Sequence, residues 1–127
     1  MLDKTAIDNE VCERSNVRDD SSFIIAQTAY QSGNIPMFCT LLDSFNATTL
    51  SRIFEIAYKD GNLQIVAAMI DYITQTDIYI CAVYAYGKNN LAMFATVIDE
   101  LNEQNILALT NMAIMDNRQE IIAMLTE

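Results

Sequence analysis

The sequence predicts an all-α fold, a short α-solenoid of stacked helix-turn-helix repeats with no β-sheet. A phrase beginning Ala-Tyr recurs at Ala29, Ala57 and Ala85 and, in a worn form, at Ala113, with each copy 28 residues after the last. A fixed period of this length is typical of stacked repeats. Apolar residues at helical spacing surround every copy, and even the β-prone stretch 79–84 falls in the position of a helix.

Four repeats follow an N-terminal segment, residues 1–20, and we place them at 21–48, 49–76, 77–104 and 105–127. The segment is polar and acidic, and Val17 falls in register with Phe45, Ile73 and Leu101. It is therefore either a degenerate half repeat that caps the first full repeat or a frayed tail. Terminal repeats need a polar outer face, which this composition would supply.

The first helix of each repeat is predicted to begin after a residue with N-cap preference, in the column Ser21, Thr49, Asp77 and Asn105. Their predicted ranges are 22–30, 50–59, 78–86 and 106–115. The apolar face predicted for these helices contains Ile25, Ala26, Ala29, Ile53, Phe54, Ile56, Ala57, Cys81, Ala82, Ala85, Leu109, Met112 and Ala113.

The turn of each repeat is predicted at Gly33, Gly61, Asn89 and Asn117, because glycine and asparagine tolerate the left-handed conformation that ends a helix. The second helices are predicted at 35–43, 63–71, 91–99 and 119–126. Their buried positions are predicted to be Met37, Phe38, Leu41, Leu42, Ile65, Val66, Met69, Ile70, Met93, Phe94, Val97, Ile98, Ile121, Ile122 and Leu125.

The turn phrase and the apolar pairs after it resemble the central helix-turn-helix of an ankyrin repeat, Ala-Ala-x-x-Gly-His-x-x-Val-Val-x-x-Leu-Leu. The match covers 29–43, 57–71 and 85–99 well and 113–127 loosely. The ankyrin Thr-Pro-Leu-His signature is absent, and the period is 28 where ankyrins have about 33. The resemblance implies an ankyrin-like stack of α-hairpins that lacks the β-hairpin finger and binds proteins.

The composition excludes several classes of function. The chain has 127 residues, a net charge of −10 and no histidine. The charge argues against nucleic-acid phosphate or anionic lipid as partners and suits a basic protein surface. No apolar run approaches the ~20 residues that cross a bilayer, so no membrane partner is expected. We expect a cytoplasmic protein, or one in a host cytosol.

No cofactor or metal is expected. The cysteines Cys12, Cys39 and Cys81 cannot pair completely and lack metal-ligand spacing, which indicates free thiols in a reducing cytosol. Helices in a stack lie about 10 Å apart, too far for successive carboxylates to share one ion. One acidic column is therefore predicted to be solvated helix-end residues: Asp43, Asp71, Asp99 and Glu127.

A tyrosine-rich stripe on the first helices is a candidate protein-binding face, since it is poor in charge. Its candidate residues are Phe23, Tyr30, Glu55, Tyr58, Tyr79, Val83 and Tyr86. The alternative is structural: Tyr30, Tyr58 and Tyr86 form a ladder that joins adjacent repeats.

A stripe of small residues on the second helices is a candidate homodimer face, or a seat for the N-terminal segment, because small residues let another helix approach closely. The alternative is an ordinary neutral surface. The stripe consists of Cys39, Ala67, Ala68, Ala95, Thr96, Ala123 and Met124.

The function that these patterns favour is a non-enzymatic protein–protein interaction module. We expect it to bind and inhibit, or sequester, a protein partner such as an enzyme, as small viral and bacterial effector proteins do. One alternative is an acidic mimic of nucleic acid, suggested by the net charge of −10. The other is a small enzyme, which the absence of histidine and of phosphate-loop or metal spacings weighs against.

Overall fold

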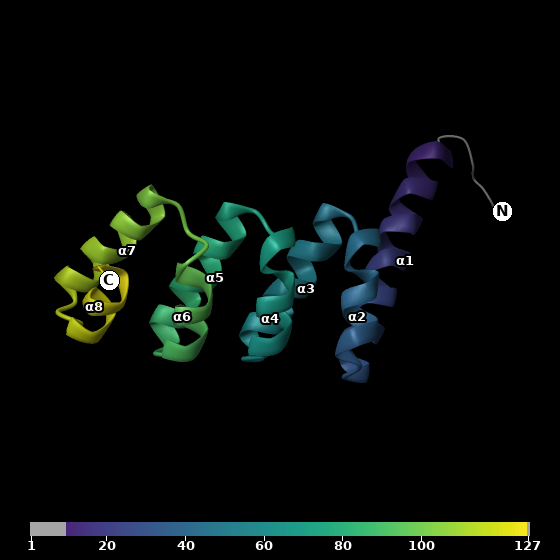
Figure 1. Ribbon diagram of the computed structural model, residues 1–127. Helices are drawn as coiled ribbons and strands as arrows, with labels where there is room; N and C mark the ends of the chain where they lie inside the picture. Colours follow the sequence, from purple (N-terminus) through teal and green to yellow (C-terminus); the bar gives the residue numbers. More distant parts are fainter. Residues whose placement is uncertain (1–9, 127) are drawn as a thin grey trace. The chain divides into compact units, whose positions relative to one another are not determined.

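The computed structural model describes the backbone of residues 10–126 and the side chains of residues 21–126 (Figure 1). This part of the chain is all-α and contains no strand, as predicted. Its elements form two compact units, one up to Ile53 and one from Phe54, so that the boundary falls within one helix. The helices are α1 Glu10–Ser32, α2 Ile35–Leu41, η1 Leu42–Ser44, α3 Ala47–Lys59, α4 Leu63–Met69, η2 Ile70–Tyr72, α5 Gln75–Lys88, α6 Leu91–Ile98, α7 Glu103–Met115 and α8 Gln119–Thr126, where η1 and η2 are 3₁₀ turns.

In the first unit, α1 and α2 pack together as a hairpin that closes over Phe38. The Phe38 ring is fully buried, and its centroid lies 6.3 Å from that of Tyr30 and 6.2 Å from that of Phe45. Edge-on and tilted contacts of this kind suit the charge distribution of aromatic rings. The connector residue Phe45 therefore completes the core of this hairpin.

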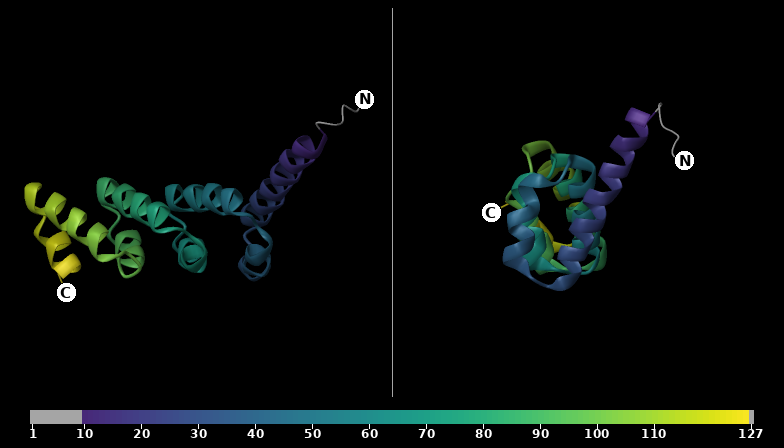
Figure 2. Two further views of the ribbon diagram at one scale, coloured as in Figure 1. Left: turned by 90° about the horizontal axis from the view of Figure 1, so that it is seen from above. Right: turned by 90° about the vertical axis from the view of Figure 1, so that its right-hand side faces the viewer.

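In the second unit, α5 packs against α6, and α7 packs against α8 (Figure 2). The helix α4 also contacts α6. Apolar side chains at helical spacing fill the space between these helices, as the periodicity predicted. The fully buried ones include Phe54, Ile65, Val66, Met69, Cys81, Met93, Phe94, Val97, Leu109 and Ile121.

The four predicted turn residues all adopt the left-handed conformation. Their φ angles are +75° at Gly33, +74° at Gly61, +57° at Asn89 and +58° at Asn117. In the first three turns, the asparagine that follows caps the next helix, because its side-chain oxygen accepts from the backbone N–H three residues later. The phrase thus ends one helix and starts the next, whereas the sequence predicted only the helix end.

The predicted N-cap column is wrong by three residues. The observed caps of α5 and α7 are Thr74 and Asn102, whose side chains accept from the N–H groups of Asp77 and Asn105. The same geometry starts α3, where the Thr49 N–H donates to Asn46 Oδ1 at 2.8 Å. The residues predicted as caps thus lie in the first turn and supply the capped N–H. Ser21 starts no helix, because α1 runs through it without interruption.

The remaining differences concern helix ends and two core positions. The helices α1 and α5 end two residues later than predicted, at Ser32 and Lys88. The α-helical parts of α2 and α4 stop at Leu41 and Met69 and continue as 3₁₀ turns, α6 ends at Ile98, and α8 has the predicted range. Ile25 and Met37, predicted to be buried, are 53% and 40% exposed. Most other predicted core residues are buried, and the half-buried ones are Leu41, Ile56, Ile70, Met112, Ile122 and Leu125.

The two interpretations of residues 1–20 fall largely outside the described residues. From Glu10 onward the backbone of this segment is helical and continuous with the rest of α1.

Two glycines provide a test of the turn geometry. Gly61→Ala should lower the free energy of unfolding by about 1–2 kcal/mol, since its φ is left-handed. Gly87→Ala, near the end of α5, should raise it by about 0.5–1 kcal/mol, because alanine favours the helix. An added Cβ would meet no atom within 4 Å at either position, so only the backbone differs. Urea denaturation of both variants measures the contrast, and equal effects would contradict the assigned backbone geometry.

Candidate protein-binding surfaces

The helices α5 and α7 lie side by side in the same direction (Figure 1). Near their starts, Gln75 donates to the carbonyl of Glu100 and accepts from the Asn102 N–H at 2.9 Å. Near their ends, the Tyr86 hydroxyl donates to the Asp116 carboxylate at 2.5 Å and lies 3.4 Å from the Met112 carbonyl oxygen. Hydrogen bonds at both ends therefore fix the register of the two helices.

Tyr86 is the structural link at the second of these ends. Its side chain is 7% exposed, and the Arg118 guanidinium lies 4.4 Å from the ring centroid while donating to the Tyr86 carbonyl at 2.8 Å. Arg118 also donates to the Asn89 side chain, so it joins two turns. Burial and then the hydrogen bond to Asp116 raise the pKa of Tyr86. The phenol therefore stays protonated as a donor at neutral pH.

Tyr58 is also buried, at 6% exposure. Its ring centroid lies 5.6 Å from that of Phe54 and 5.2 Å from that of Tyr84 on α5. Burial, aided by the charge of Glu55, raises the pKa of Tyr58 to about 12. Tyr58 and Tyr86 are therefore removed from any surface that a partner could reach. Each joins successive first helices, as the ladder interpretation proposed, although Tyr58 meets Tyr84 rather than another tyrosine of its own column.

The other predicted binding residues are more accessible. Tyr30, Tyr79 and Val83 are half-buried, whereas Glu55 is exposed and forms a 2.7 Å salt bridge with Lys59. Phe23 is half-buried beneath the Arg52 guanidinium, 3.6 Å from its ring centroid. The tyrosine stripe is thus not one open face, since its members differ in exposure and in what covers them.

The small-residue stripe is at least partly accessible along its length. Ala67, Ala95 and Ala123 are exposed, and the half-buried members are Cys39, Ala68, Thr96 and Met124. The Thr96 hydroxyl is used within its own helix, where it donates to the Ala92 carbonyl at 2.8 Å. A homodimer through this stripe stays a prediction.

The described cysteines are free thiols, as predicted. Cys81 is fully buried, and burial raises its pKa to about 12, so no thiolate forms near neutral pH. Cys39 is half-buried on α2, and Cys12 lies outside the described side chains. In the acidic column, Asp43, Asp71 and Asp99 are exposed, as expected of solvated residues, and Glu127 lies outside the described range.

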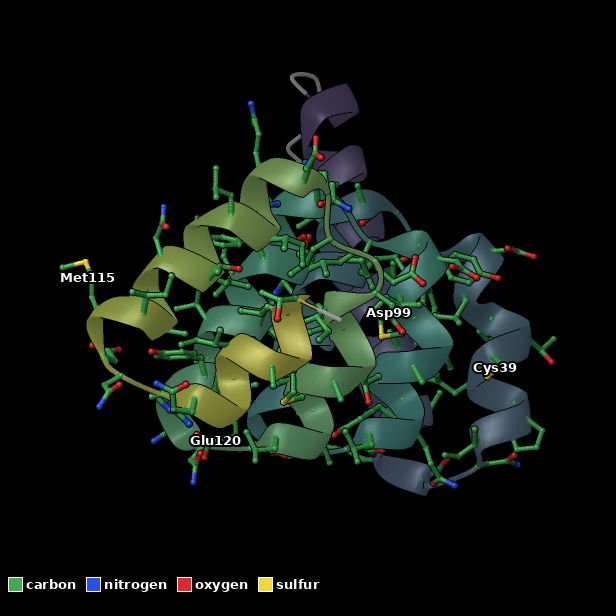
Figure 3. All side chains as sticks on the ribbon, turned by 60° about the vertical axis from the view of Figure 1, so that its left-hand side comes forward. Cys39, Asp99, Met115 and Glu120 are labelled. Carbon is green, nitrogen blue, oxygen red and sulfur yellow. The ribbon has the colours of Figure 1, made fainter. Side chains whose placement is uncertain are left out.

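An exposed, uncharged surface on α5 and α7 was not predicted from the sequence. We call it the outer surface and define it by Ile80, Ala108 and Met115, all of which are exposed. Met115 projects from the end of α7 and is 85% exposed (Figure 3). The only charged residue of α7 is Glu103, in its first turn. The equivalence of Ile80 and Ala108, 28 residues apart, was the signal that could have found this surface.

Within the side chains that the structure describes, no three acidic or cysteine residues are grouped so as to hold a metal ion. None of the described helices has the length and apolar character needed to cross a membrane. Comparison with protein-family models, with curated proteins and with solved structures found no match to this chain.

Proposed function

We propose that this chain is a non-enzymatic protein-binding module, a short ankyrin-like α-solenoid that inhibits or sequesters the protein it binds. The observation that carries the proposal is the outer surface. Exposed apolar side chains with little charge among them are typical of protein-binding sites, whose centres are depleted in charged residues. The nearest charged residue before Ile80 on α5 is Asp77, one turn away. In a chain with a net charge of −10, exposed positions would be expected to carry mostly charged or polar side chains, so exposed apolar ones stand out.

The recurring local geometry supports the solenoid. The left-handed turn residues Gly33, Gly61, Asn89 and Asn117 are 28 residues apart, and so are the asparagine caps of α2, α4 and α6. The neighbouring helices α5 and α7 also begin 28 residues apart and run in the same direction. Stacked repeats place equivalent surface residues side by side, which extends a binding surface across several repeats.

The charges around the outer surface indicate the chemistry of the partner. Glu103 lies at the start of α7 and Asp116 directly after its end, and α5 has Asp77 in its first turn and Lys88 in its last, so three of the four flanking charges are acidic. A complementary protein would present apolar side chains at the centre of its interface and lysine or arginine at the rim. Such rim charges mainly speed association and reject wrong partners. The free thiols of Cys39 and Cys81 are consistent with action in a reducing cytosol.

The experiment begins with affinity capture from a lysate of the source organism and identification of the captured protein by mass spectrometry. Affinity is then measured with the purified partner. The double variant Ile80→Asp/Met115→Asp should bind at least about tenfold more weakly, since each change places an unpaired charge in the interface. Both side chains are exposed, so the fold should survive, and circular dichroism checks this.

Met37→Asp is the matched control, because Met37 is an exposed apolar residue on α2, outside the outer surface. It should leave the affinity unchanged. Equal binding by the double variant and the wild type would overturn the outer surface as the binding site. Loss of binding in both variants would instead indicate a general effect of added negative charge. Turnover of a substrate by the purified chain would contradict the non-enzymatic proposal itself.

A further inference from the structure

The helices α1, α3, α5 and α7 correspond to the four predicted first helices. One apolar position is exposed on α1 although the equivalent positions on α3, α5 and α7 are buried. Ile25 on α1 is 53% exposed. The residues 28, 56 and 84 positions later are Ile53, Cys81 and Leu109, and each is fully buried. An apolar residue is therefore left uncovered on α1 where the rest of the chain covers its equivalents.

The helix α7 has apolar residues that are exposed although equivalent residues on earlier helices are covered. Ile114 on α7 is 56% exposed, whereas its equivalents Tyr58 and Tyr86 are buried. Leu107, seven residues before Ile114 and on the same side of the helix, is 60% exposed. Its equivalent Phe23 is covered by the Arg52 guanidinium. The α7 face formed by Leu107 and Ile114 thus lacks the cover that equivalent residues have elsewhere.

Contacts within each unit show what provides that cover. The residue that covers Phe23 is Arg52, 29 positions ahead, and the ring that meets Tyr58 is Tyr84, 26 positions ahead. Tyr86 likewise lies against Met112, 26 positions ahead. In each case the cover is the next first helix of the chain. The cover for the Leu107–Ile114 face would therefore be another helix of the same kind.

The side of the covering helix that makes these contacts can be identified on α7. Met112 and Asp116 contact Tyr86, and the buried Leu109 shares their face, because the three are spaced i, i+3 and i+7. The equivalent face of α1 carries Ile25, Thr28 and Ser32, all of which are exposed. The exposed face on α1 is therefore of the type that would cover the exposed face on α7.

We propose that two copies of this chain associate head to tail, with the Leu107–Ile114 face of one copy packed on the Ile25–Thr28–Ser32 face of the other. The contact would continue the interface that joins α5 and α7. None of the five residues that define the two faces is charged, so their contact buries no unpaired charge despite the net charge of −10 on each copy. Because the two faces differ, the interface is heterologous, and it can add copies into open chains.

The test is sedimentation of the full chain across micromolar to millimolar concentrations. The weight-average mass should rise with concentration, and more steeply at high salt, which screens repulsion between copies. Ile25→Asp and Ile114→Asp should each weaken association by about a hundredfold, because each places a charge in one face. An equimolar mixture of these variants should form a 1:1 complex, since each retains the face that the other lacks.

The mixture separates this interface from other arrangements and from misfolding. A symmetric dimer through α7 would survive Ile25→Asp, and a dimer through the small-residue stripe would survive both changes, so either result would overturn the proposal. A wild type that stays monomeric throughout the concentration range would also overturn it. The double variant Ile80→Asp/Met115→Asp should self-associate as the wild type does. If that variant loses partner binding but still self-associates, the loss concerns the outer surface and not the head-to-tail interface.

Discussion

Replacing Phe94 with alanine is expected to lower the free energy of unfolding by about 3–5 kcal/mol. Phe94 is fully buried on α6, and its ring centroid lies 6.3 Å from that of Tyr86 on α5. The substitution removes apolar contacts and leaves a cavity that the surrounding helices fill only in part. Since folded domains are stable by about 5–15 kcal/mol in total, this change removes a large share of the stability.

Urea denaturation followed by circular dichroism measures this loss. Phe94→Leu is the first control and should cost clearly less, because leucine retains most of the buried volume. Ile122→Ala is the second control: it occupies the equivalent position on α8, 28 residues later, but its side chain is only half-buried. A Phe94→Ala variant no less stable than Ile122→Ala would contradict the placement of Phe94 at the centre of the α5–α6 hairpin.

The helices and turns could be predicted from the sequence because the same physical constraint recurs four times. A residue that ends a helix in the left-handed conformation should be glycine, which adopts it without strain, or asparagine, which adopts it at a small cost. The column Gly33, Gly61, Asn89 and Asn117 satisfies this requirement, and all four have positive φ angles. One such residue would be weak evidence, but repetition at a constant spacing made the assignment firm.

The helix starts were predicted less well because two columns of residues have the same preference. Thr74 and Asn102 are good N-caps, but so are Asp77 and Asn105, three residues later. Sequence preference does not show which side chain accepts the hydrogen bond. The geometry shows that the earlier residue accepts and the later one donates its N–H, as at Thr74 and Asp77.

The candidate surfaces were the hardest to predict, because spacing defines a helix face but not what lies opposite it. Tyr58, Tyr86 and Ile114 hold equivalent positions, yet the first two are buried and the third is exposed. The difference depends on whether a further helix covers the residue. For the same reason Ile25, which the periodicity assigned to the core, is exposed.

The double variant Tyr58→Ser/Tyr86→Ser is expected to lose about 6 kcal/mol of stability, on the order of 3 kcal/mol at each buried ring. This loss is comparable to the whole stability of many domains, so the helical signal at 37 °C should fall sharply. If both tyrosines instead belonged to an open binding face, the variant would remain folded and lose only partner capture. Circular dichroism with thermal denaturation separates the two outcomes.

Two further variants show which part of Tyr86 matters. Tyr86→Phe removes only the hydroxyl that donates to Asp116 and should cost about 0.5–1.5 kcal/mol. Ile114→Ser changes the equivalent position where the side chain is exposed, and its effect should stay within about 0.5 kcal/mol. A large loss for Tyr86→Ser beside a small one for Ile114→Ser would show that the following helix, rather than the residue type, makes this position structural. Similar losses at the two positions would mean that something else covers Ile114 in solution. Head-to-tail association would supply such a cover, and its contribution would grow with protein concentration.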